Sequence, residues 1–364
     1  MSDRQLFIAA VAILSLTLTS CGPGTTSMFR VDASRSGTVS DAGPKSLDTL
    51  KWKYTAPDKV YSSPVAGDDE IYLGCNDGFL YAVSTDTGLL NWKFRTDGNV
   101  ESTPALVGDT LYVGSWDNSL YAINTKTHGT KWKYPTKGPV SSSPVVVDDV
   151  VYFGSEDGRV YAVEADTGYE VWNFDAKGGV YSSPAVYGDH VFFGTMTGYL
   201  FAVDIKTGQE FWRFNAHQKI HSSPAVDGDK VYIGTDAKMV HAINIKTGQE
   251  LWKKKTAGQV LSSPAIDGDR IIVGSKDGYV YSFDAGNGSR QWEFRTEGPV
   301  FSAPIVASDT VYIGSTDMHL YAITASRGNL RWKYRSDNKI YSSPTVKDGA
   351  VYFSSVNGSL YAIQ

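Results

Sequence analysis

Cysteine is scarce in this chain, which contains only Cys21 and Cys75 among its 364 residues. If Cys21 carries a lipid, Cys75 is the one thiol left, and no disulfide framework can hold the fold together. Cys75 stands where other parts of the sequence have Ser or Thr, so we interpret it as a small residue beside a turn.

Long apolar runs and charge of one sign are also missing. The mainly apolar run from Leu6 to Leu18 is too short for a membrane-spanning helix. The formal net charge is −5 with both signs dispersed, and the absence of a basic stripe argues against a nucleic-acid partner. No helical apolar period, phosphate loop, Ser/His/Asp arrangement or pair of carboxylates stands out, so the sequence carries no signature of an enzyme.

Tryptophan, in contrast, recurs with a fixed spacing of 40 residues. Such a period indicates a repeat array, a solenoid or a propeller. Only Trp116 lies off this register. The repeated tryptophans, which we expect to be structural, are Trp52, Trp92, Trp132, Trp172, Trp212, Trp252, Trp292 and Trp332.

Each repeat contains four short runs rich in Val, Ile, Tyr, Phe and Trp, separated by Gly, Asp, Asn and Ser. A Ser-Ser-Pro step such as Ser62-Ser63-Pro64 precedes the first run, and the fourth run holds the Trp. Turns such as Gly67-Asp68 and Asp77-Gly78 have the composition of tight hairpins. A single four-stranded sheet cannot bury both of its apolar faces, whereas sheets arranged radially cover one another. The fold class is therefore all-β, with four-stranded antiparallel blades.

The repeat count predicts how the ring closes. Seven complete units follow Val60, and an eighth supplies three strands before the chain stops at Gln364. Its missing Trp strand is present at the other end as residues 50–54. We therefore predict an eight-bladed β-propeller over residues 48–364, closed by the N-terminal strand joining the last blade.

Residues 1–21 resemble a lipoprotein signal peptide. Arg4 precedes the apolar run, and Leu18-Thr19-Ser20-Cys21 matches a lipobox. We expect Cys21 to be the lipid anchor and Gly22 to favour the outer membrane; a plain secretory signal is the alternative. Residues 22–47, rich in Gly, Ser and Thr, are interpreted as a tether and pre-blade segment.

The repeats resemble a known family. The segments 162–172, 202–212 and 242–252, with Ala, Thr-Gly and Trp at matching places, are similar to the tryptophan-docking motif of pyrroloquinoline-quinone-like (PQQ-like) propellers. The segment from Met28 to Gly37 looks like the one that often precedes their first blade. The resemblance covers residues 28–364, whereas WD40 and kelch repeats fit less well.

This resemblance implies two classes of function. Family dehydrogenases hold a quinone between a Trp and a vicinal Cys-Cys disulfide, over calcium, whereas other members, including the BamB-like lipoprotein of the β-barrel outer-membrane assembly machinery, are not catalytic. Our chain has no Cys-Cys pair, no haem site and no long insertion. We therefore expect no enzyme, no metal and no cofactor, with PQQ and calcium as the alternative.

A candidate binding site lies where the repeats differ. The residue before each Ser-Ser-Pro step varies and should ring the mouth of the central channel. The alternative is that these residues only contact the adjacent loop. Glu101 and His221 also raise a metal interpretation, although two ligands three blades apart do not make a site. The candidate funnel residues are Tyr61, Glu101, Trp116, Tyr181, His221, Phe301 and Tyr341.

The sequence therefore predicts a non-catalytic, membrane-anchored propeller that acts as a protein-interaction scaffold in the cell envelope. Its expected partners are envelope proteins, with the outer-membrane β-barrel assembly machinery among them. Its expected location is the cell envelope: the outer membrane, facing the periplasm, in a Gram-negative cell, and otherwise a membrane-anchored, extracytoplasmic position. A quinone-binding oxidoreductase or sensor and a binder of small ligands or glycans remain as alternatives.

Overall fold

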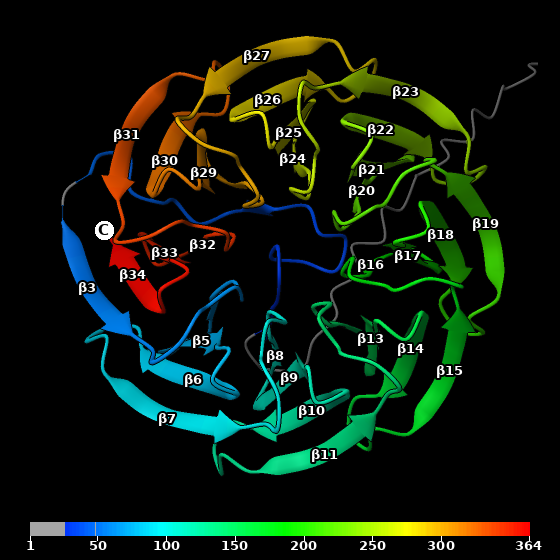
Figure 1. Cartoon of the computed structure of the whole chain (residues 1–364), viewed down its shortest axis with the longest axis vertical. Helices are drawn as coiled ribbons and strands as arrows, with labels where there is room; N and C mark the ends of the chain where they lie inside the picture. Colours follow the sequence, from blue (N-terminus) through cyan, green and yellow to red (C-terminus); the bar gives the residue numbers. More distant parts are fainter. Residues whose placement is uncertain (1–25, 48) are drawn as a thin grey trace, which may run out of the picture.

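The computed structural model of the protein describes residues 26–47 and 49–364. Eight four-stranded antiparallel sheets stand radially around a central channel (Figure 1), which confirms the predicted eight-bladed propeller. The proposed signal peptide and Cys21 lie outside the described residues. Within those residues, we find no helix of the length and apolarity that a membrane crossing needs.

Four strands form each blade, and they follow one another from the channel outwards (Figure 1). The innermost strands are β4 (Val65–Ala66), β8 (Ala105–Val107), β12 (Val145–Val147), β16 (Ala185–Tyr187), β20 (Ala225–Asp227), β24 (Ala265–Asp267), β28 (Ile305–Ala307) and β32 (Thr345–Lys347). The second strands are β5 (Glu70–Gly74), β9 (Thr110–Ser115), β13 (Val150–Gly154), β17 (His190–Gly194), β21 (Lys230–Thr235), β25 (Arg270–Gly274), β29 (Thr310–Gly314) and β33 (Ala350–Ser354). The third strands are β6 (Phe79–Ser84), β10 (Ser119–Asn124), β14 (Arg159–Glu164), β18 (Tyr199–Asp204), β22 (Met239–Asn244), β26 (Tyr279–Asp284), β30 (His319–Thr324) and β34 (Ser359–Ile363). The outer strands are β7 (Leu90–Arg95), β11 (Thr130–Pro135), β15 (Glu170–Asp175), β19 (Glu210–Asn215), β23 (Glu250–Lys255), β27 (Arg290–Arg295), β31 (Leu330–Arg335) and β3 (Leu50–Thr55).

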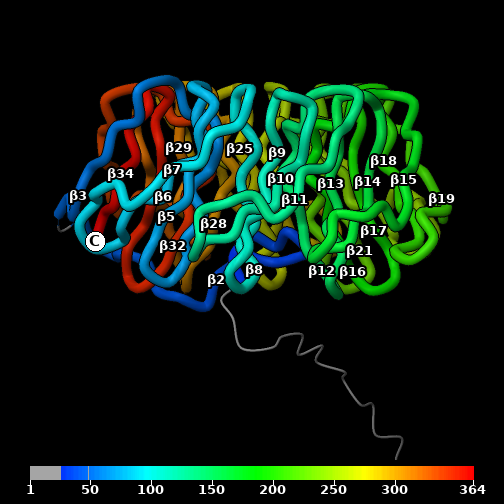
Figure 2. The backbone as a smooth tube through the Cα atoms, turned by 90° about the horizontal axis from the view of Figure 1, so that it is seen from below, coloured from blue at the N-terminus to red at the C-terminus, as the bar shows by residue number. Residues whose placement is uncertain are grey.

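We number the blades one to eight from β4 onwards, so blade eight contains β32, β33, β34 and β3. Because strands alternate in direction, two kinds of connection share each end of the propeller. The links between blades and the turns between second and third strands lie at one end, which we call the mouth face. The other end, which we call the leader face, carries the remaining turns. Figure 2 shows residues 26–47 at this leader face.

Ring closure occurs in blade eight, as the repeat count predicts. The outer strand β3 pairs with β34, placing Trp52 opposite Ala362, and the sheet order is β3-β34-β33-β32. The amides and carbonyls of Thr49 and Gln364 also exchange hydrogen bonds of 3.1 and 3.2 Å. Both ends of the propeller domain are thus held in one sheet.

Each repeated tryptophan joins its blade to the next one. The ring of Trp172, for example, lies over Gly208 in the following blade, and its indole N–H donates to the carbonyl of Ile205 at 2.9 Å. The same bond to the residue 33 positions further on recurs at 2.7–3.1 Å from Trp52, Trp132, Trp212, Trp252 and Trp292. This contact explains the Thr-Gly step of the repeat, because a side chain at the glycine would collide with the indole.

Two tryptophans depart from this pattern. Trp92 stacks on His128 at a centroid distance of 4.6 Å and donates to the Glu70 carboxylate at 3.1 Å. The second is Trp332. Its indole instead donates to the carbonyl of Pro44 at 3.0 Å, so a residue ahead of the first blade completes the last contact.

A second belt of hydrogen bonds explains the Ser-Ser-Pro step. In most blades the amide of the second residue of the step donates to the hydroxyl of the matching residue one blade on. Ser143 donates to Ser183 at 2.9 Å, and Ser343 closes the circle by donating to Ser63 at 2.8 Å. These buried bonds link the innermost edges of the blades, as the tryptophans link their outer parts.

Residues 26–47, which we call the leader, lie in the range that the sequence assigns to a tether and pre-blade segment, and they pack against the blades. Carbonyls of Ala33, Ser34, Ser36 and Gly37 accept hydrogen bonds from amides spaced 40 residues apart, those of Val186, Val226, Ile266 and Val306. The leader also contributes β1 (Thr26–Ser27), antiparallel to β8, and β2 (Thr38–Val39), parallel to β28. It therefore lines the channel, because the free edges of the innermost strands offer it unpaired backbone groups.

Two arginines anchor the leader inside the channel. Arg35 is fully buried and donates to the carbonyls of Pro184, Ser143 and Pro144 at 2.9–3.1 Å. Arg30 reaches the carbonyls of Ser263 and Pro304 at 3.0 and 3.3 Å. Burial lowers the pKa of both guanidinium groups to about 9, so both remain charged at neutral pH. The carbonyls of the Ser-Ser-Pro steps thus solvate two buried cations.

Replacing Arg35 by methionine should destabilise the propeller. The change leaves the buried carbonyls of blades three and four without their donor, and we expect the free energy of unfolding to fall by about 2–4 kcal/mol. Denaturant unfolding measures this effect. Arg327→Met is the matched control at an exposed turn, and it should change stability by less than about 0.5 kcal/mol. Equal stabilities of the two variants would contradict the anchoring role.

Candidate functional site: the channel mouth

Two positions in each blade vary in chemistry and meet at the mouth face. One precedes the Ser-Ser-Pro step, and the other is in the turn between the second and third strands. Side chains of the two rows contact each other, as Asn76 and Glu101 do, and first-row residues also contact one another, as Phe301 and Tyr341 do. Together the two rows form a circle. We call this circle the mouth ring; in order it contains Tyr61, Asn76, Glu101, Trp116, Ser141, Glu156, Tyr181, Met196, His221, Asp236, Leu261, Lys276, Phe301, Thr316, Tyr341 and Val356.

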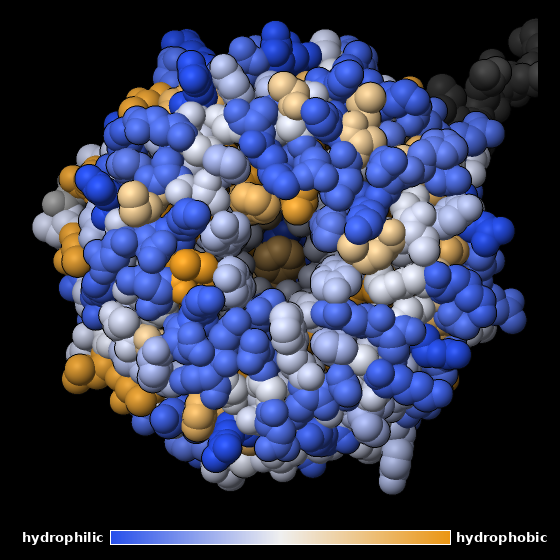
Figure 3. Space-filling view, viewed as in Figure 1, coloured by the Kyte–Doolittle hydropathy of each residue, from blue (hydrophilic) through white to orange (hydrophobic). Residues whose placement is uncertain are grey.

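The mouth ring surrounds a hollow at the centre of this face. Figure 3 shows the hollow, with hydrophobic residues at its bottom and on part of its rim, and hydrophilic residues over most of the surrounding surface. The elements that hold the ring are rigid, since each varying residue adjoins a buried strand and a belt of inter-blade hydrogen bonds. Side chains can therefore differ here without disturbing the contacts that close the propeller.

One side of the ring is polar and acidic. Asn76 donates to Glu101 at 3.1 Å, and the Trp116 indole donates to Ser141 at 2.9 Å. Ser141 and Tyr181 both donate to Glu156, at 2.7 and 2.6 Å. We call this side, which comes from blades one to four, the acidic wall; it comprises Asn76, Glu101, Trp116, Ser141, Glu156 and Tyr181.

The opposite side is aromatic and aliphatic. Phe301 contacts Tyr341 at a centroid distance of 5.0 Å, and Tyr341 contacts Tyr61 edge-on at 5.9 Å. Lys276 lies on this side, but its ammonium group donates to Gln259 at 2.6 Å and sits 5.6 Å from the Phe301 ring. We call this side the apolar wall; it comprises Leu261, Phe301, Tyr341, Val356 and Tyr61.

Electrostatics distinguish the acidic residues of the ring. Burial raises the pKa of Glu101, and the nearby charge of Glu156 raises it further, although the bond from Asn76 opposes this. The hydrogen bond to Glu156 raises the pKa of Tyr181 to about 12. Burial lowers the pKa of His221, against the opposing effect of Asp236, whose carboxylate lies 3.8 Å away. Glu101 and Glu156 thus lie on the same side of the rim, where the charge of Glu156 raises the pKa of Glu101.

The structure places all seven funnel residues proposed from the sequence in this ring. Glu101 and His221, which raised the metal interpretation, are not brought together. Glu101 contacts Asn76, and His221 lies near Asp236. Sequence reasoning found only Trp116 of the second row and missed Asn76, Glu156 and the others. The sequence does contain a signal for the second row. The first residue of the turn between the second and third strands varies from blade to blade as much as the residue before Ser-Ser-Pro.

The donor set does not fit the quinone and calcium that the family resemblance implies. Cys75 is fully buried and is flanked by Gly74 and Asn76 rather than by a second cysteine. Within residues 26–47 and 49–364, no group of three His, Cys, Asp or Glu side chains is arranged to hold a metal ion. We derive no chemistry through such a group.

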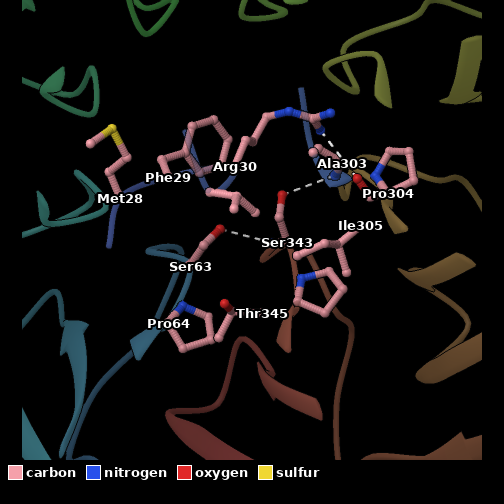
Figure 4. A pocket seen from close by; sticks show the side chains of 13 residues that line it. Met28, Phe29, Arg30, Ser63, Pro64, Ala303, Pro304, Ile305, Ser343 and Thr345 are labelled. Atoms are coloured by element: carbon pink, nitrogen blue, oxygen red, sulfur yellow. Dashed lines mark hydrogen bonds between the residues drawn. The ribbon is translucent and has the colours of Figure 1, made fainter. Parts of the chain in front are cut away.

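Two other hollows lie away from the mouth ring. Figure 4 shows a small cavity between the leader and blades seven, eight and one, with Met28, Arg30, Ser63 and Ser343 on its walls; its volume of about 20 Å³ holds about one water molecule. An open groove of about 970 Å³ runs between blades one and two at the leader face, and its lining includes Glu70. The leader forms part of the wall of the first cavity, and the second is an open acidic surface.

Comparison with known proteins supports the architecture. A family model described as "Beta-alanine-activating enzyme, beta-propeller" matches residues 33–227 and 185–364, and the chain belongs to this β-propeller family. A search of curated proteins finds no significant match.

Solved structures share the fold at low sequence identity. BamB from Moraxella catarrhalis superposes with a TM-score of 0.75 at 16% identity, over 87% of this chain and 99% of that one. The computationally designed protein Ika8 gives 0.77 at 18%, again over 87% and 99%. Quinohemoprotein alcohol dehydrogenase from Comamonas testosteroni gives 0.80 at 13%, over 92% and 80%. At these identities the likeness shows the β-propeller fold alone, which BamB and a quinohemoprotein alcohol dehydrogenase share.

Trp116 should dominate the solvent-accessible fluorescence of the protein. It is 42% exposed, whereas the eight repeated tryptophans are each 7–9% exposed. We expect Trp116→Phe to remove most of the emission that acrylamide quenches, and Trp172→Phe to leave that quenching in place. Stern–Volmer titration of the folded proteins makes the comparison. Unchanged quenching in Trp116→Phe would contradict its place at the rim.

Proposed function

We propose that the protein is a non-catalytic binding propeller that acts as an interaction scaffold in the cell envelope. The observation that carries this proposal is the mouth ring, where side-chain variation between blades is concentrated around one hollow. The rest of each blade repeats the residues that close the ring and its hydrogen-bond belts. A rigid scaffold that varies at a concave, solvent-exposed site is suited to recognition.

The location is part of the proposal. The lipobox at Cys21 supports a lipid anchor, and the fold shared with BamB supports a place in the envelope, with outer-membrane protein assembly as the process served. The described chain reaches the propeller at the leader face (Figure 2). An anchor attached on that side would leave the mouth ring turned away from the membrane and free to meet partners.

Site-specific photo-crosslinking in intact cells tests this function. A photoreactive residue at Tyr181, on the mouth ring, should capture outer-membrane barrel proteins or their insertion machinery, identified by mass spectrometry. The control places the same residue at Tyr169, which is 73% exposed at a leader-face turn. We expect it not to capture them. Cys21→Ser should move the protein from the membrane fraction to the soluble fraction.

Two results would count against the proposal. Capture of no envelope protein at Tyr181, or of the same set at Tyr169, would remove the scaffold role of the mouth. Reduction of an electron-accepting dye by the purified protein with an alcohol substrate, dependent on added pyrroloquinoline quinone and calcium, would favour the oxidoreductase alternative instead.

A further inference from the structure

We infer that the mouth ring binds an extended peptide segment carrying a basic side chain next to an aromatic or aliphatic one. This inference rests on the proposed binding function and names the chemistry of the partner. It follows from the two unlike walls of the ring, which come from different blades around the central hollow; Figure 3 shows this hollow.

The acidic wall offers unneutralised negative charge. Glu101 and Glu156 accept hydrogen bonds from neutral groups, and neither makes an ion pair with a Lys, Arg or His within residues 26–47 and 49–364. The charge of Glu156 disfavours ionisation of Glu101. A cation bound at this wall would offset the negative charge of both carboxylates, and it is the group that the wall lacks.

Aromatic rings complete the cation site. Trp116 and Tyr181 are 42% and 39% exposed, and each uses its polar atom to bond within the wall. Because the Trp116 N–H and the Tyr181 O–H are engaged, the rings are held in place while much of their surface stays open. Exposed indole and phenol faces attract ammonium and guanidinium groups. Carboxylates and ring faces on the same wall therefore favour a lysine or arginine side chain.

The apolar wall selects what accompanies the cation. Phe301, Tyr341 and Tyr61 form a continuous aromatic surface, and Leu261 and Val356 are the aliphatic residues of this wall. The ammonium group of Lys276 on this side is already occupied by Gln259. An aliphatic or aromatic side chain would bury apolar area here, whereas a free small cation would leave the apolar wall exposed to water.

Charge and shape also separate this occupant from a lipid surface. The ring lines a hollow rather than a projecting face (Figure 3), so a flat bilayer would not reach it. Anionic headgroups would face the Glu101 and Glu156 carboxylates and be repelled. A peptide segment, in contrast, can enter a concave site and place side chains on both walls.

Peptide titration of the purified full-length protein tests the inference, with Trp116 fluorescence as the readout. The probe is the end-blocked peptide Gly-Ser-Lys-Phe-Ser-Gly, the Lys-Phe peptide. Two comparison peptides replace Lys by Glu (the Glu-Phe peptide) or Phe by Ser (the Lys-Ser peptide). We expect saturable binding of the first peptide, and about tenfold weaker binding of the other two. Binding of the first peptide should weaken as salt concentration rises.

Variants separate the two walls. Glu101→Gln with Glu156→Gln should weaken the Lys-Phe peptide about tenfold and abolish its preference over the Glu-Phe peptide. Phe301→Ala with Tyr341→Ala should weaken the Lys-Phe peptide and abolish its preference over the Lys-Ser peptide. Asp86→Asn with Asp166→Asn, two exposed carboxylates at leader-face turns, is the control and should change neither. Thermal unfolding of each variant verifies that it is folded.

The inference fails if none of the peptides binds, if the Glu-Phe peptide binds as well as the Lys-Phe peptide, or if tetramethylammonium binds as tightly as the Lys-Phe peptide. It also fails if the double Gln variant binds like the unaltered protein. If the peptide test fails in any of these ways but Tyr181 still crosslinks to envelope proteins in cells, only the inferred partner chemistry is wrong. If Tyr181 also captures no envelope protein, the proposed function is wrong.

Discussion

The contact between each repeated tryptophan and the next blade is the constraint on which this structure depends. In most repeats the indole covers a glycine and donates to a carbonyl 33 residues further on, so ring, turn and strand must keep one geometry there. The spacing of 40 residues follows from this requirement. Pro44 of the leader supplies the carbonyl that Trp332 contacts, and β3 supplies the outer strand of blade eight. Closure of the circle is therefore made from both ends of the chain.

Regularity of this kind limits where function can reside. Outer strands carry the tryptophans, second and third strands are almost wholly buried, and innermost strands hold the serine belt and the leader. Leader-face turns are restricted by the glycines that the indoles cover. The exposed side chains in the links and turns at the mouth face are not subject to these requirements. An acidic and an apolar wall could therefore arise there without cost to the fold, and they form the binding surface that we propose.

Sequence alone predicts the periodic part of this molecule and little of the rest. Eight tryptophan strands and only seven complete units require that residues 50–54 close the last blade, so the fold could be predicted by counting. The place of the leader could not, because Arg30 and Arg35 bind backbone carbonyls, which every residue has, more than a hundred positions away. At the mouth, the row containing Tyr61 could be found from its variation. Its contacts with the row containing Glu156 join neighbouring blades, so the sequence of a single repeat does not reveal them.

A comparison of two glycine substitutions tests the tryptophan contact most directly. Gly208 and Gly228 have φ of +68° and +58°, so alanine meets the same left-handed backbone at both. A Cβ at Gly208 would lie 2.6 Å from the Trp172 ring, whereas one at Gly228 meets nothing within 4 Å. We expect Gly228→Ala to lower the free energy of unfolding by about 1 kcal/mol, and Gly208→Ala by about 2 kcal/mol more. Equal losses in the two variants would contradict the account.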